Sequence, residues 1–231
     1  MEQKELNIRK EKNLPLNLLR GKTAIFIDLD GTLADSLGFL YPVYLQFLEN
    51  NGVKGDKEEF ETLNGPPIES IVQTLKEKYD FSTGIKELCD EYFVLIKDRY
   101  LETVKIFEGS QEFLEKAKEK GLKLFLTTSN YREIVKDFLK KHKLESCFSS
   151  LFCGDDFNFN KSDPSYYIKI FTLAGVKQDS ALIIEDSFRI IEDAQKKSLA
   201  AVAFCPEPRS PLPIVPIAQT WQEMTRCLNI L

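Results

Sequence analysis

Short runs of apolar residues recur along the chain and are separated by longer stretches with a helical pattern. The five clearest runs are residues 23–27, 122–127, 151–153, 181–184 and 200–204. Most of them are continuous instead of alternating, which is typical of parallel strands that are covered on both faces. Strands that alternate with helices predict an α/β fold with a doubly wound parallel sheet.

The stretches between these runs place their apolar residues on one face of a helix. In residues 110–121 the pattern ends at Gly121, a residue type that commonly ends a helix. Residues 131–142 and 164–175 show the same amphipathic pattern. Near the end of the chain, a proline-rich stretch predicts a surface connection to a last helix at residues 221–230.

One long segment interrupts the alternation of strands and helices. From about residue 36 to residue 105 the pattern is almost wholly helical, without a strand-like run. We therefore expect a core formed by residues 22–36 and 106–231, with residues 37–105 inserted as an all-helical cap. Residues 1–21 are charged throughout and lack the apolar stretch of a secretory signal, so we expect a mobile extension or a short surface helix.

Composition and charge narrow the classes of function. The formal net charge of −5 argues against binding to nucleic acid, because phosphate backbones favour a basic face. No apolar run approaches the roughly 18–20 residues of a membrane span. The five scattered cysteines form neither a disulfide framework nor a zinc motif, so a cytoplasmic location is expected. The single histidine, His142, lies in a charged stretch and is expected to be a solvated helix residue.

Two acidic residues stand at the end of the first predicted strand. Asp28 and Asp30 are two positions apart, so their side chains point to the same side if the chain stays extended. Gly31 permits a sharp turn, and the hydroxyl of Thr32 is expected to hydrogen-bond back and fix it. Such a pair suits an aspartate nucleophile beside an aspartate acid and base, with a hard cation between them. The alternative is an ordinary Asp-Gly turn with solvated acids.

Three further groups of polar residues follow in order. Residues 127–130 end the second strand with hydroxyl and amide groups that suit phosphoryl oxygens, or that merely cap the next helix. Lys161 precedes a helix, although a single lysine is more often a surface residue. Glu185 and Asp186 end a buried strand, where acids are unexpected unless they are paired or bound to a metal.

In this order the features resemble the haloacid dehalogenase-like hydrolases, in the subgroup with a helical cap that includes phosphoglycolate phosphatase and beta-phosphoglucomutase relatives. Residues 28–32, DLDGT, match the first motif, and Thr128 matches the second. Lys161 matches the third motif, and the pair at residues 185–186 matches the acidic fourth motif. The resemblance covers roughly residues 22–205 and implies a Rossmann-like core.

The resemblance also implies roles for individual residues. Asp28 would attack phosphorus and form an aspartyl-phosphate, and Asp30 would act as the acid and then as the base. Thr128, Ser129 and Lys161 would hold the phosphoryl oxygens of a small phosphorylated metabolite.

A magnesium ion, Mg²⁺, is the cofactor that the resemblance implies. Asp28, the backbone carbonyl of Asp30, and Asp186 would be its protein ligands, with water completing the shell. Glu185 would either orient this shell or bind the metal directly. Many relatives carry a second aspartate where this chain has Ile190, and Asp156 is kept only as a remote candidate.

The cap bears on which reaction is expected. Gly65, Pro66 and Pro67 resemble a specificity loop of the phosphatase-type relatives, whereas mutase relatives usually place an arginine there. Asp30 disfavours dehalogenation, because the dehalogenases of this superfamily lack it. We therefore expect a phosphatase, with a beta-phosphoglucomutase-like mutase and a catalytically silent partner protein as alternatives. The sequence leaves the oligomeric state open.

Overall fold

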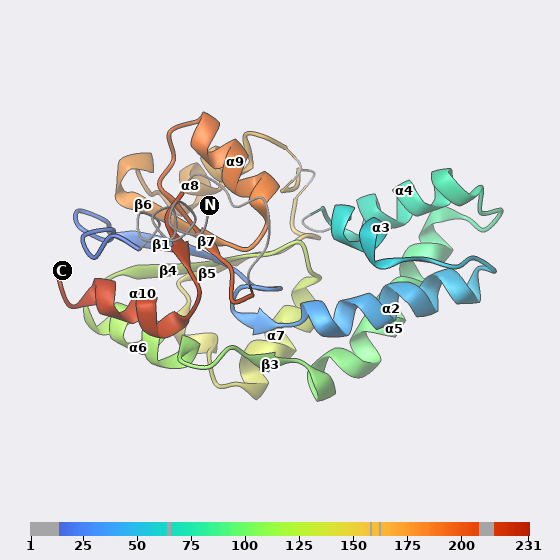
Figure 1. The fold of residues 1–231 in the computed structure, drawn as a ribbon, viewed down its shortest axis with the longest axis horizontal. Helices are drawn as coiled ribbons and strands as arrows, with labels where there is room; N and C mark the ends of the chain where they lie inside the picture. Colours follow the sequence, from blue (N-terminus) through green and yellow to red (C-terminus); the bar gives the residue numbers. More distant parts are fainter. Residues whose placement is uncertain (1–13, 64–65, 158, 162, 208–214) are drawn as a thin grey trace, which may run out of the picture.

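The core of the protein is a six-stranded parallel sheet with helices on both faces (Figure 1). The computed structural model describes residues 14–63, 66–157, 159–161, 163–207 and 215–231. The strand order is β5-β4-β1-β6-β7-β8, formed by β1 (Ala24–Asp28), β4 (Lys123–Thr127), β5 (Ser150–Phe152), β6 (Ala181–Glu185), β7 (Ala201–Phe204) and β8 (Ile217–Ala218). The doubly wound sheet expected from the sequence is confirmed, and each predicted strand lies within one residue of the observed one.

Alternate residues of the central strand β1 pack on opposite faces of the sheet. Ala24 and Phe26 belong to the core beneath α8 (Tyr166–Ala174) and α9 (Phe188–Lys196). Ile25 and Ile27 belong to the core on the other face, which is covered by α6 (Ser110–Glu119), α7 (Arg132–Lys141) and α10 (Trp221–Leu228). Figure 1 shows these two groups of helices on opposite sides of the sheet. Burial on both faces explains why the strand sequence is continuously apolar.

The order of the strands places the carboxyl end of β1 at a topological switch point. From β1 the chain continues to β4 and β5 on one side, and then crosses to β6, β7 and β8 on the other. Strand β1 therefore pairs with β4 through Asp28 and Thr127, and with β6 through Ile27 and Ile184. Ligands of open α/β sheets bind at such a point, outside the carboxyl ends of the strands.

The segment after β1 forms a helical cap that extends to one side of the core (Figure 1). Its helices are α2 (Leu37–Asn50), α3 (Lys57–Thr62), α4 (Ile68–Tyr79) and α5 (Ile85–Thr103). At the base of the cap, the two chain crossings pair as antiparallel strands, β2 (Ala34–Asp35) and β3 (Lys105–Ile106). The sequence pattern did not predict this small sheet, because two residues are too few to show a period.

Two expectations about the rest of the chain need correction. Residues 14–21 are not a mobile extension, because Leu19 is fully buried and Cys227 donates a hydrogen bond to the carbonyl of Pro15 at 3.6 Å. Residues 1–13 lie outside the described part. The connection before the last helix is not only a surface loop, because it contains the edge strand β8. Among the described residues, no helix combines the length and the apolar character that a membrane crossing needs.

Candidate active site

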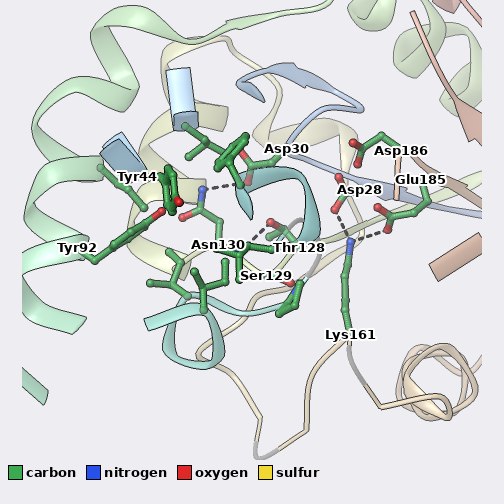
Figure 2. A pocket seen from close by; sticks show the side chains of 17 residues that line it. Asp28, Asp30, Tyr44, Tyr92, Thr128, Ser129, Asn130, Lys161, Glu185 and Asp186 are labelled. Atoms are coloured by element: carbon green, nitrogen blue, oxygen red, sulfur yellow. Dashed lines mark hydrogen bonds and ion pairs between the residues drawn. The ribbon is translucent and has the colours of Figure 1, made fainter. Parts of the chain in front are cut away.

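The polar residues singled out in the sequence meet at the carboxyl edge of the sheet (Figure 2). Asp28 ends β1, Thr128 follows β4, and Glu185 ends β6. Lys161 comes from the loop between β5 and α8 and points toward the same place. Parallel strands have their carboxyl ends on one edge, so residues far apart in sequence come together without any local motif that joins them.

Lys161 is a buried cation held between two acids. Its Nζ atom forms ion pairs with Asp28 and with Oε2 of Glu185, the latter at 2.7 Å. The side chains of Lys161 and Glu185 are each only 2% exposed, so this is not a surface lysine. Burial alone would lower the pKa of Lys161, but Asp28 and Glu185 raise it well above its ordinary value. The ammonium group is therefore a permanent positive charge in this site.

Three buried carboxylates form a cluster that suits a divalent cation. One oxygen of each of Asp28, Glu185 and Asp186 lies within 4.8 Å of the others. Burial and repulsion from Glu185 raise the pKa of Asp28 well above its ordinary value, although Lys161 opposes the shift. When ionised, the three acids and Lys161 carry a net charge of about −2, which a dication would balance. The residues present therefore fit a divalent cation such as Mg²⁺.

Gly31 brings the backbone against this cluster. Its φ angle is +85°, in the left-handed region, and its N–H donates to the carbonyl of Ala34 at 2.9 Å. A Cβ atom at this position would lie 2.6 Å from Oδ2 of Asp186, so only glycine fits. The expected hydrogen bond from the hydroxyl of Thr32 is wrong, because that buried oxygen has no partner among the described residues. Instead the carbonyl of Thr32 accepts from Nε1 of Trp221 at 3.1 Å.

Asp30 lies outside the cluster of three acids, and two residues hold its carboxylate. The hydroxyl of Tyr100 donates to Oδ1 at 2.6 Å, and Nδ2 of Asn130 donates to Oδ2 at 3.1 Å. Burial and the charge of Asp30 raise the pKa of Tyr100 well above its ordinary value, so this hydroxyl keeps its proton. Tyr100 belongs to the cap helix α5, and its role has no signal in the sequence. For Asn130 there is only a general indication in the sequence, namely an amide side chain that follows a strand.

The residues after β4 provide donors on the other side of Asp28. Thr128 is buried, and its Oγ1 accepts a hydrogen bond from the N–H of Asn130 at 3.0 Å, which leaves its hydroxyl proton to donate elsewhere. Ser129 also lines the cavity above Asp28. Behind the cluster, the hydroxyl of Tyr167 donates to Oε2 of Glu185 at 3.1 Å. Nothing in the sequence singled out Tyr167, which is one apolar position of α8 among several.

The remaining candidates lie elsewhere or only in part within the described residues. Asp156 forms an ion pair with Arg132 and accepts from the N–H of Cys153 at 2.6 Å, so it belongs to a loop and not to the acidic cluster. Pro66 lines the cavity, and Pro67 directly precedes the first residue of α4. Gly65, the third member of the expected specificity loop, lies outside the described residues.

A cavity lies between the core and the cap, with the catalytic candidates at its base. Its empty volume is about 720 Å³, including the part that is open to solvent. The described core residues that line it are all polar: Asp28, Asp30, Thr128, Ser129, Asn130, Lys161, Glu185 and Asp186. The cap lines it with Leu40, Tyr44, Phe60, Leu63, Pro66, Ile68, Ile71, Tyr92 and Ile96. Apolar walls with a few polar groups at one end are typical of a small-molecule site.

Comparisons with known proteins agree with this geometry. A family model described as haloacid dehalogenase-like hydrolase matches residues 25–204. A putative pyrophosphatase PpaX from Caldanaerobacter subterraneus subsp. tengcongensis is 30% identical over 183 residues, which cover 78% of this chain and 80% of that protein. A phosphorylated carbohydrates phosphatase from Thermotoga maritima is 24% identical over 179 residues, with coverage of 78% and 83%. The solved structure of a predicted phosphoglycolate phosphatase from Haemophilus somnus has a TM-score of 0.74 at 19% identity, covering 89% of this chain and 97% of that one.

Proposed function

Because the chain belongs to the haloacid dehalogenase-like hydrolase family, we propose that it is a phosphatase that hydrolyses a small phosphorylated metabolite through a phosphoryl group held on Asp28. The ion pair of Lys161 with Asp28, inside a buried acidic cluster at the base of a cavity, is the observation that carries this proposal. A buried nucleophile beside a fixed cation is what phosphoryl transfer needs, because this reaction depends on position and charge neutralisation. Relatives named as phosphatases support the same reaction class.

In the first step, an oxygen of Asp28 attacks phosphorus as the bond to the leaving oxygen breaks. Asp30 donates a proton to that oxygen, so the product leaves as a neutral alcohol. Tyr100 and Asn130 hold the two oxygens of Asp30 and fix its orientation. Each oxygen of Asp30 has a second lone pair, so the carboxyl group can carry the proton while both contacts remain.

In the second step, Asp30 takes a proton from water, and the water oxygen attacks phosphorus. The bond between phosphorus and Asp28 breaks, and inorganic phosphate leaves. Lys161, the hydroxyl of Thr128 and Ser129 hold the phosphoryl oxygens through both steps. The same donors act in both steps because the phosphoryl group stays in one place. Only the oxygen bonded to it changes, from the leaving group to Asp28 and then to water.

Mg²⁺ is the proposed cofactor, held by Asp28, Asp186 and the backbone carbonyl of Asp30. When bound, it would neutralise charge on the transferring group and favour the ionised form of Asp28. For Glu185, the hydrogen bonds from Lys161 and Tyr167 to one oxygen support an orienting role over direct ligation. Removal of Mg²⁺ by a chelator should then stop phosphate release without unfolding the protein.

The test is phosphate release from a panel of phosphorylated metabolites, with and without Mg²⁺, for the unmodified chain and for Asp28→Asn. Asparagine has nearly the same shape, and Lys161 keeps its partner Glu185, so the fold should persist. We expect metal-dependent release that the substitution abolishes. Activity of Asp28→Asn near that of the unmodified chain would overturn the covalent role of Asp28.

Two other outcomes would point to other functions. Conversion of a sugar phosphate without phosphate release, started by a bisphosphate, would indicate a mutase. Binding of Mg²⁺ with no turnover of any phosphate ester would indicate a catalytically silent partner protein.

A further inference from the structure

We infer that the phosphate ester carries an uncharged, largely apolar leaving group, and that aryl or arylmethyl monophosphates are the best substrates. This inference rests on the proposed phosphatase function and adds the class of substrate to it. The observation behind it is the division of the cavity into two unlike halves. The core supplies polar and charged side chains, and the cap supplies none that is charged among the described residues that line the cavity. Figure 2 shows the cap side chains facing the catalytic group across this space.

The position of the leaving group follows from the position of the phosphoryl group. Asp28 attacks phosphorus and Lys161 binds the phosphoryl oxygens at the base of the cavity, and Asp30 protonates the leaving oxygen. The rest of the leaving group must then extend away from the sheet, toward the cap. There it meets the aromatic rings of Tyr44 and Phe60, whose centroids are 5.6 Å apart. Aromatic faces bind flat apolar rings well, both by burial and by ring stacking.

No cationic side chain of the cap lines this space in the described part of the chain. Lys78 is bound to Glu59 at 2.5 Å, Lys86 to Asp90 at 2.7 Å, and Lys97 to Glu133 on the core helix α7 at 2.6 Å. The two loop residues outside the described part are Asn and Gly at positions 64 and 65, so the sequence adds no charge there. A carboxylate or a second phosphate on the leaving group would therefore be buried against apolar walls without a counter-charge, which is costly.

The carboxylate of Glu59 behind the cap wall is already paired with Lys78. The hydroxyls of Tyr44 and Tyr79 both donate to Oε2 of Glu59, in the latter case at 2.8 Å. Although burial alone would raise the pKa of Glu59, hydrogen bonds from Lys78 and the two tyrosines lower it overall, so this carboxylate is ionised. The hydroxyl of Tyr44 is committed to Glu59, which leaves its ring as the surface toward the cavity. Because Glu59 and Lys78 balance each other, this wall offers no counter-charge to an anionic leaving group.

Among the described residues that line the cap side, one polar group remains for the substrate. Tyr92 lines the cavity and is 4% exposed, and its hydroxyl has no hydrogen-bond partner among the described residues. Burial raises its pKa well above the ordinary value, so the hydroxyl is a neutral donor. It can satisfy one neutral acceptor of the leaving group, such as a carbonyl or a ring oxygen.

Pyrophosphate and sugar bisphosphates do not belong to this class of substrate. Pyrophosphate would leave as a phosphate anion, and a sugar bisphosphate would place its second phosphate toward the cap. Neither anion has a partner on that side among Leu40, Phe60, Ile68 and the other described cap residues that line the cavity. We therefore expect both compounds to be poor substrates, although one relative carries the name pyrophosphatase.

The experiment compares three arylmethyl phosphates that differ only at the far end of the ring: benzyl, 4-carbamoylbenzyl and 4-carboxybenzyl phosphate. The last two have the same size and leaving alcohols of similar acidity, and they differ by one charge. We expect kcat/KM for 4-carbamoylbenzyl phosphate to exceed that for 4-carboxybenzyl phosphate by at least about tenfold, with benzyl phosphate at least as good as the former.

Ile71→Lys provides a second test, because it puts a cation on the half-buried part of the cap wall. It should narrow or reverse the ratio between the carbamoyl and carboxy compounds. The matched control is Gln73→Lys, on the exposed face of the same helix α4, which should leave the ratio unchanged.

The outcomes distinguish the two proposals. If 4-carboxybenzyl phosphate is hydrolysed as well as its neutral counterpart, the substrate inference is wrong and the phosphatase proposal stands. If no phosphate ester of any charge releases phosphate in a manner that depends on Mg²⁺ and on Asp28, both fail together.

Discussion

Gly31→Ala should weaken Mg²⁺ binding by displacing Asp186. The added Cβ would lie 2.6 Å from Oδ2 of Asp186, and ordinary contacts begin near 3.4 Å. The carboxylate therefore has to move by about 0.8 Å, several times the roughly 0.2 Å within which metal–ligand distances are usually kept. We expect the apparent affinity for Mg²⁺ to fall at least about tenfold, a loss typical when the support of a ligand is disturbed.

The same substitution also strains the backbone, and this effect has to be separated from the first. A left-handed conformation costs a residue with a Cβ about 1–2 kcal/mol, and the loss of glycine from the unfolded chain offsets about 0.4–1 kcal/mol of this. Gly121→Ala is the matched control, because Gly121 has a φ angle of +80° and no atom within 4 Å of its added Cβ. Both variants should lose roughly 0.5–1 kcal/mol of unfolding free energy from the backbone alone.

The measurements are urea unfolding and a Mg²⁺ titration, followed both by phosphate release and by the rise in melting temperature that bound metal produces. Gly121→Ala should bind Mg²⁺ like the unmodified chain, and Gly31→Ala should not. Equal Mg²⁺ affinity and equal stability in the two variants would refute the argument, because contact with Asp186 would then have no consequence. A loss of Mg²⁺ affinity in both would show that the effect does not come from that contact.

Three other variants probe the partners of the site. Lys161→Met should lower the unfolding free energy by about 3–5 kcal/mol in the absence of Mg²⁺, because Asp28 and Glu185 lose their buried counter-charge; urea unfolding at unchanged stability would contradict this. Tyr100→Phe should lower kcat for alkyl phosphates by about tenfold or more. The loss should be smaller for 4-nitrophenyl phosphate, whose leaving group needs no proton and which uses Asp30 only in the second step; an unchanged kcat for both would exclude a role through Asp30. Tyr167→Phe should cost about 1–3 kcal/mol of unfolding free energy, measured in the same way, because Glu185 loses a buried donor; a change within a few tenths would show that the bond at 3.1 Å contributes little.

The sequence predicted those parts of the molecule that depend on local pattern. Continuous apolar runs marked the core strands, and polar residues directly after them marked Asp28, Thr128 and Glu185 as neighbours. This inference works because parallel strands end on a common edge, so the position along each strand is enough to bring the residues together. Lys161 needed the family resemblance, since a single lysine in a loop carries no pattern of its own.

What the sequence did not predict depends on contacts across long separations. Tyr100 reaches Asp30 from 70 positions away, and a tyrosine in a helix looks the same whether it packs in a core or holds a carboxylate. The edge strand β8 and the burial of Leu19 were not predicted for a related reason. The structure of a short or charged segment depends on the surface that it packs against. Thr32 shows the opposite error. Its hydroxyl was expected to hydrogen-bond within the turn, but it has no partner among the described residues, and the carbonyl of Thr32 accepts from Trp221 instead.

The pairing of β2 with β3 also affects how the cap could be exchanged. Ala34 and Ile106 are paired residues, so the core meets the whole cap as a loop whose ends are already joined. The entropy of closing a loop rises only with the logarithm of its length, by about 0.6 kcal/mol for each doubling, so an insert of another size would change this entropy cost little. A hairpin turn could bridge the same two residues. Such a minimal chain would keep Asp28 and Lys161 but lose Tyr100. An exchange of the cap at this junction could therefore change the choice of substrate, but it would also remove the tyrosine that orients Asp30.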